Sequence, residues 1–111
     1  MIRLKRVGLI WAVCLSACGD PVQQHIDTII EGRDGIDDAK LSLNMAKGTA
    51  IEPVIHAFED HSLSTRARLD LADALYRLYL REDDGRIFAS LVAALEDPVP
   101  EVRAGVARAV G

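Results

Sequence analysis

The C-terminal part of the chain repeats its own pattern, and this repetition restricts the fold more than any other feature of the sequence. Residues 67–75 match residues 102–110 at an offset of 35 positions, and residues 53–60 match residues 90–97 at an offset of 37. Repeats of this length are usually single supersecondary units, each too small to bury its own apolar side. Stacking on neighbouring units then buries a continuous core.

A fainter copy precedes these two. Residues 25–48 align without a gap to residues 53–76 at an offset of 28, so that apolar positions fall on apolar positions along most of the segment. Three units are about the minimum for a stable stack of this kind.

The pattern inside each copy is helical. Apolar residues recur three and four positions apart in the last copy, at Phe88, Leu91, Val92 and Leu95, and no segment alternates cleanly with a period of two. Half of the residues are apolar but only 5% are aromatic, a composition that favours helices over strands. We therefore expect six helices of about 8–14 residues with short connections.

Proline and serine residues suggest where these helices begin. Pro53 and Pro100 suit the first turn of a helix, where the missing amide donor costs nothing. Ser62 and Ser64 are candidate N-caps for the helix that follows them.

The last copy also resembles a known repeat family. Residues 97–111 read DPVPEVRAGVARAVG, an acidic residue, a short turn and then Val-Arg before small and aliphatic residues. This resembles the turn and second helix of a HEAT repeat of the short PBS-lyase type, and residues 88–95 resemble its first helix. The resemblance implies an all-α fold, an α-solenoid of about three HEAT-like helical hairpins over residues 25–111, divided near 25–48, 49–81 and 86–111.

The same resemblance assigns a structural role to four polar residues. Asp60 with Arg68, and Asp97 with Arg103, occupy the positions that form an Asp–Arg ladder between neighbouring HEAT repeats. The implied role is hydrogen bonding of each turn to the next repeat. The first copy departs from the pattern, because Gly32 and Lys40 occupy its ladder positions.

The N-terminus has the order of a secretory signal. Three cations within the first six residues precede an apolar run from Val7 to Leu15, which is too short to span a bilayer. The next residues complete the sequence LSAC, which resembles the bacterial lipobox ending at Cys18. That resemblance implies a signal peptide over residues 1–17, cleavage before Cys18 and acylation of Cys18 with chains such as palmitate. The alternative is an ordinary cleaved signal with an incidental cysteine.

The predicted signal peptide and lipobox indicate where the protein is located. Residues 18–24 would form a lipidated tether on the exported side of a membrane of the cell envelope, held stably by two or more acyl chains. Gly19 rather than an aspartate follows Cys18, which favours the outer membrane over the inner one.

Charge argues against several kinds of partner. Without the signal peptide the chain has 10 basic and 17 acidic residues, a net charge of −7. This excess of acid predicts no nucleic-acid binding and no peripheral adsorption to anionic lipid. The expected membrane contact is therefore the lipid alone.

No motif predicts catalysis, a metal or a cofactor. His56, Glu59, Asp60 and His61 form the one cluster of candidate ligands, but their spacing matches no metalloprotease motif. The acidic pairs at residues 37–38 and 83–84 lack the spaced oxygen ligands of a calcium loop and suit turns or first helical turns. We expect no enzyme activity; the alternative is an accessory, lyase-like or metal-dependent component of a HEAT-repeat enzyme.

The C-terminal end carries an apolar pattern with no capping unit after it. The valines Val99, Val102, Val106 and Val110 predict either a docking face for a protein or a second copy, or a chain that is a fragment of a longer repeat protein. The expected function is a membrane-anchored adaptor that binds an unknown protein partner.

Overall fold

The computed structural model describes residues 20–111, which form six α-helices and one short 3-10 helix and contain no strand. In chain order they are α2 (Pro21–Glu31), α3 (Ile36–Ala46), α4 (Gly48–Phe58), α5 (Thr65–Glu82), α6 (Gly85–Ala93), η1 (Ala94–Glu96) and α7 (Pro100–Val110). The all-α prediction and the number of helices are confirmed for this part of the chain. The proposed signal peptide and Cys18 lie outside the described residues.

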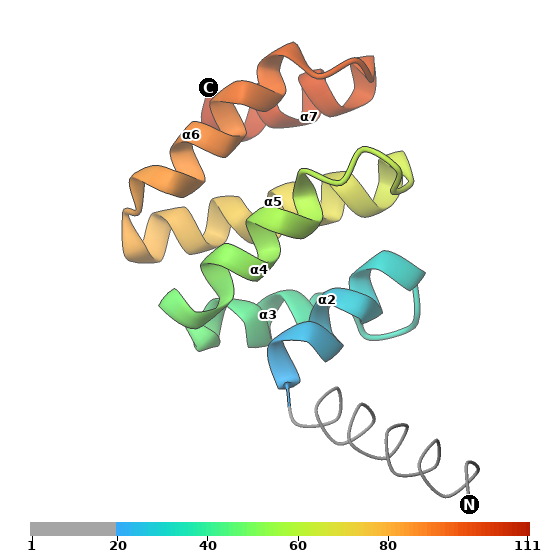
Figure 1. The fold of residues 1–111 in the computed structure, drawn as a ribbon, viewed down its shortest axis with the longest axis vertical. Coiled ribbons are helices and arrows are strands. Elements are labelled where there is room, and N and C mark those ends of the chain that lie inside the picture. Colours follow the sequence, from blue (N-terminus) through green and yellow to red (C-terminus); the bar gives the residue numbers. More distant parts are fainter. Residues whose placement is uncertain (1–19) are drawn as a thin grey trace, which may run out of the picture.

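Consecutive helices form three antiparallel hairpins, α2 with α3, α4 with α5, and α6 with α7 (Figure 1). The middle hairpin contacts both others, and α5 touches each of the other five α-helices. Within residues 20–111, the helices of the first hairpin make no backbone contact with α6 or α7. The middle hairpin therefore holds the outer two together.

The core follows from the apolar face of α5. Leu71, Leu75 and Leu78 are fully buried and recur at the four- and three-residue spacing that puts them on one side of the helix. Each hairpin contributes to the same cluster, which includes Ile29 and Val106 from the two outer hairpins. At 18 residues, α5 is longer than the sequence suggested, because its apolar face serves all three hairpins.

The first helix begins four residues before the expected start at His25. The Asp20 carboxylate accepts a hydrogen bond from the Gln23 amide at 3.3 Å, and Pro21 stands in the first turn, where it needs no amide partner. The segment between Cys18 and the helix therefore consists of Gly19 and Asp20 alone, whereas a helix start at His25 predicts about six residues.

Pro53 lies inside α4 and not in its first turn, so that prediction is wrong, whereas Pro100 does begin α7. The helix starts at Gly48, and its added first turn buries Ala50 and Ile51. Burial of these two side chains outweighs the hydrogen bond that Pro53 cannot donate.

The connections between consecutive helices are short. Lys47 alone joins α3 to α4, in a backbone conformation with φ of 55°, and Asp83 with Asp84 joins α5 to α6. The remaining connections are residues 32–35, 59–64 and 97–99. The chain therefore reverses or turns at each junction with little intervening loop.

Of the two candidate caps, only Ser64 caps a helix. Its hydroxyl accepts a hydrogen bond from the Ala67 amide at 3.1 Å, whereas Ser62 lies in the preceding turn and donates to Asp60. We expect Ser64→Ala to lower the free energy of unfolding by about 1 kcal/mol, because it leaves an amide of the first turn of α5 without a partner. Urea denaturation would measure this, with Ser62→Ala as the matched control. Equal losses in the two variants would contradict the assignment.

Candidate functional site

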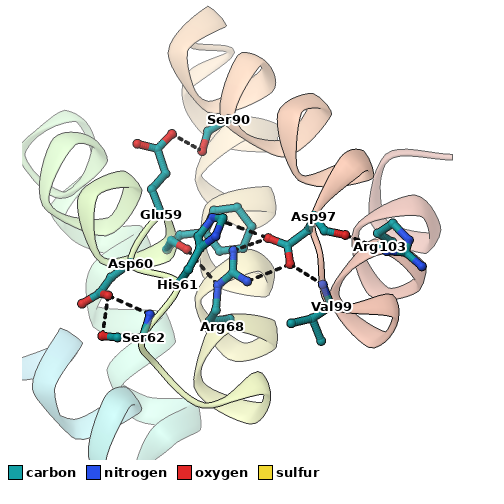
Figure 2. A network of polar contacts seen from close by, with 10 residues as sticks. Glu59, Asp60, His61, Ser62, Arg68, Ser90, Asp97, Val99 and Arg103 are labelled. Atoms are coloured by element: carbon teal, nitrogen blue, oxygen red, sulfur yellow. Dashed lines mark hydrogen bonds and ion pairs between the residues drawn. The ribbon is translucent and has the colours of Figure 1, made fainter.

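The main buried polar contact joins the second hairpin to the third. Both terminal nitrogens of the Arg68 guanidinium, on α5, donate to the Asp97 carboxylate at 2.9 and 2.6 Å, and each of the two side chains is 2% exposed (Figure 2). Asp97 lies in the turn just before α7. A paired, two-bond geometry of this kind is the one in which an ion pair tolerates burial.

Neighbouring groups complete the bonding of this pair. Arg68 Nε donates to the Phe58 carbonyl at 3.2 Å, and its guanidinium carbon lies 5.4 Å from the centre of the Phe58 ring. The Val99 amide donates to Asp97 at 2.9 Å, and His61 Nε2 lies 3.7 Å from the same carboxylate. Among residues 20–111, no buried side-chain nitrogen or oxygen lacks a hydrogen-bond partner.

Of the four predicted ladder residues, Arg68 and Asp97 pair with each other across neighbouring hairpins, and Asp60 and Arg103 have other partners. Asp60 does not meet Arg68; it is exposed and accepts hydrogen bonds from the amide and hydroxyl of Ser62 at 3.0 and 2.6 Å. Arg103 donates to the main-chain oxygen of Asp97 at 2.7 Å and not to its carboxylate. The turn that contains Asp97 packs directly over α5, so its carboxylate reaches Arg68 of the preceding hairpin first.

The first and second hairpins are joined by other residues. Lys40, in one of the positions where the ladder pattern fails, places Nζ 3.0 Å from both Asp70 and Asp73 of α5. Burial disfavours the charged lysine, but the hydrogen bonds to the two carboxylates outweigh this and raise its pKa.

Arg66 makes the second link between these hairpins. It donates to the main-chain oxygens of Ile29 and Ile30, at 2.8 and 3.0 Å, and so satisfies carbonyls at the end of α2. Neither Arg66 nor the acidic partners of Lys40 were predicted from the sequence. The available signal was the spacing of Arg66 and Asp70, four positions apart, which form an ion pair along α5.

The candidate metal ligands do not converge. Glu59 accepts a hydrogen bond from Ser90 at 3.2 Å, Asp60 pairs with Ser62, and His61 lies near Asp97 (Figure 2). In the part of the chain that the structure describes, no three His, Cys, Asp or Glu side chains are grouped as metal ligands would be. Of the acidic pairs, residues 37–38 lie in the first turn of α3, Asp83 ends α5, and Asp84 caps α6.

The predicted valine face is wrong in its residues. Val102 and Val106 are fully buried, and Val99 and Val110 pack at the edge of the same core. They turn inward because α7 lies close against α5; a Cβ on Gly105 would collide with the end of the Leu69 side chain.

A different apolar set is exposed at this end of the molecule. Phe88, Val92 and Leu95, on α6 and η1, are 46, 40 and 36% exposed. Their spacing of four and three residues places them along one side of this helix. We call these three residues the α6 strip.

The Arg68 contact predicts a specific response to acid. Hydrogen bonds from Arg68 hold the pKa of Asp97 below the ordinary aspartate value of about 3.9. Because the pKa is lower in the folded state, the ionised carboxylate contributes its full stabilisation at pH values above the pKa of the unfolded chain. This stabilisation is lost as the pH falls through the pKa of the folded state.

We therefore expect the stability difference between the wild type and Asp97→Asn to be constant above about pH 5 and to shrink in more acidic solution. Urea denaturation over a series of pH values from neutral to acid would measure it. A difference that stays constant through the acid range would contradict the link to Asp97.

None of the described helices combines the length and apolar character needed to cross a membrane. Comparisons of the chain with protein-family models, with curated proteins and with solved structures gave no match.

Proposed function

We propose that this chain is a lipid-anchored protein of the cell envelope, an α-solenoid of three HEAT-like hairpins that binds other proteins through its surface. The observation that supports the repeat assignment best is the order of contacts, in which the first and third hairpins each touch the second but not each other. Stacked repeats have this nearest-neighbour pattern. Arg68 and Asp97 add a buried polar link between consecutive units.

The proposed anchor lies close to the first hairpin. If Cys18 carries acyl chains, only Gly19 and Asp20 separate it from the helix that starts at Pro21, a reach of about 10 Å. Such a short tether would hold the domain against the lipid headgroups. The third hairpin is then the part best placed to meet another protein, and the outer membrane is our preferred location because Gly19 follows the cysteine.

A labelling experiment would test the anchor. Cells expressing the full chain would be grown with radioactive palmitate, and the label and membrane fraction compared for the wild type, Cys18→Ser and Cys14→Ser. We expect Cys18→Ser to lose the label and to leave the membrane fraction, while the matched control Cys14→Ser keeps both. Label on both variants, or on neither protein, would contradict the lipoprotein assignment.

A crosslinking experiment would test the binding role. The tagged chain would be purified from crosslinked envelope membranes beside a control that joins the same N-terminal 24 residues to an unrelated soluble domain. We expect the helical domain to retain at least one discrete crosslinked protein that the control does not. The same species in both samples, or none in either, would contradict the adaptor role.

A further inference from the structure

The three most exposed large apolar side chains of residues 20–111 lie on two neighbouring helices. Leu41, Met45 and Leu80 are 56, 65 and 66% exposed. Leu41 and Met45 are four positions apart and share one side of α3, and Leu80 is on α5, which packs beside α3. Leu80 also borders a small cavity toward the end of α7, but most of its side chain is exposed.

A polar contact between α3 and α5 places these side chains on one surface. Arg81 donates to Asn44 Oδ1 at 3.2 Å and so joins the two helices at this point. Asn44 lies three positions after Leu41, and Leu80 and Arg81 lie three and four positions after Arg77. These spacings keep each set on one side of its helix. We use the name α3–α5 face for five exposed residues, Leu41, Met45, Arg77, Leu80 and Arg81.

The α3–α5 face lies along the side of the stack of hairpins and not at one of its ends. Contacts run from α3 to α5 to α7 and from α2 to α4 to α6, so the helices form two layers. Figure 1 shows α2, α4 and α6 in front of the other three helices. A further hairpin at either end of the stack would add a helix to each layer and leave the outer side of α3 and α5 uncovered.

Cations outnumber carboxylates on this surface. The carboxylates of Asp70 and Asp73 are shared, at distances from 2.6 to 3.3 Å, by three cations, namely Lys40, Arg66 and Arg77. Arg81 adds a fourth cation, which forms no ion pair with any carboxylate among the described residues. The surface is therefore locally basic, although the chain as a whole is acidic.

The proposed anchor is at the same end of the first hairpin as Met45. The two helices of this hairpin have 11 residues each and run antiparallel, so Pro21, at the start of α2, lies at the same end as Met45, near the end of α3 (Figure 1). The exposed Asp37 and Asp38 are at the opposite end of α3, about 10 Å along the helix from Met45. A two-residue tether from Cys18 would bring lipid to the apolar end of the hairpin.

We propose that the α3–α5 face lies on the phospholipid bilayer to which the chain is anchored. Leu41, Met45 and Leu80 enter the boundary between headgroups and acyl chains, and Arg77 and Arg81 extend to lipid phosphates. The anchor keeps the local lipid concentration high, so the acidic excess that disfavours adsorption from solution does not prevent this contact. The inference rests on the proposed anchor and adds which side of the domain meets the lipid. The α6 strip, in the other layer, stays accessible to a protein.

The test uses residues 18–111, which contain every described helix and the described core. Without the signal peptide this chain has one thiol, Cys18, and no tryptophan, because Cys14 and Trp11 are absent. Cys18 would be coupled through a maleimide lipid to vesicles of phosphatidylcholine and phosphatidylglycerol. Attachment is then chemical and does not require acylation in a cell.

A single introduced tryptophan would report contact with the bilayer. The reporters are Met45→Trp and Leu80→Trp, and the matched control is His56→Trp, at an exposed position of α4 in the other layer. Coupling should move the emission of both reporters to shorter wavelength and make it quenchable by brominated phosphatidylcholine, while His56→Trp changes in neither respect. Circular dichroism would verify that all three variants stay helical. Unchanged emission in both reporters, or equal changes in all three variants, would overturn the proposal.

Replacing the arginines tests the polar part of the contact. In the Met45→Trp chain, Arg77→Gln with Arg81→Gln should lower the ratio of lipid-bound to free face on the order of 10-fold, because each cation near an anionic surface adds to the attraction. The control is Arg33→Gln, an exposed arginine in the turn after α2, which should keep the quenching. Equal losses in the two variants would contradict a role for this face. Failure of these tests would leave the anchor intact, whereas failure of the palmitate labelling would remove the anchor itself.

Discussion

Leu75→Asp is expected to abolish the folded state. Leu75 is fully buried on the face of α5 that all three hairpins share. Removing its side chain alone costs about 2–5 kcal/mol, and an unpaired carboxylate buried in its place adds further to this loss. A domain of this size has a total stability of about 5–15 kcal/mol, so the combined loss is enough to unfold it.

Circular dichroism and thermal melting would measure this effect. The matched control is Leu80→Asp, the same change on the same helix at an exposed position, which should shift the free energy of unfolding by about 0.5 kcal/mol or less. Loss of the helical signal and of a cooperative melt in Leu75→Asp alone is the expected result. A Leu75→Asp variant with wild-type helicity and melting would show that the hairpins do not share this core.

Arg68→Met is expected to be the most damaging change of a polar residue. It leaves the Asp97 carboxylate buried without its cation, although methionine fills much of the same space. Breaking a buried ion pair from one side costs about 3–5 kcal/mol, because the remaining charge has lost its compensation. The third hairpin should be affected most, since this pair joins its turn to α5.

Denaturation by urea would measure the cost, with Arg77→Met as a control. Arg77 pairs with Asp73 at 3.3 Å on the exposed side of the same helix, and its loss should cost about 1 kcal/mol or less. The double variant, Arg68→Met with Asp97→Asn, contains no unpaired buried charge. Its loss in the free energy of unfolding should be about 0.5–3 kcal/mol smaller than the sum of the losses in the two single variants. Strictly additive losses would show that the two residues do not act as a pair.

The sequence predicts the helical class well, because this class depends on local periodicity. The unit boundaries inferred from the repeats fall near Lys47 and Asp84, where the structure places the junctions. Helix starts were less predictable. Pro53 looks like a first-turn residue, and only the burial of Ile51 against the core explains why α4 starts earlier.

The polar contacts were harder to predict than the helices. The repeat pattern identifies Arg68 and Asp97 as structural residues, but the choice of partner depends on how closely each turn packs over the preceding hairpin. The predicted face of valines on the last helix was wrong for the same reason, because burial depends on how the helices pack. Val106 on α7 and Val92 on α6 both fit a helical apolar pattern, and only the side of each helix that packs against the core decides that the first is buried and the second exposed.

The short connections between helices have a kinetic consequence. Among residues 20–111, the contacts between helices form within one hairpin or between hairpins that are adjacent along the chain, and Lys47 alone separates two of the helices. Little chain entropy is lost when such near neighbours meet, and helical proteins rich in local contacts fold within microseconds to milliseconds. The speed of folding of this chain should therefore depend more on helix propensity than on a search for distant partners.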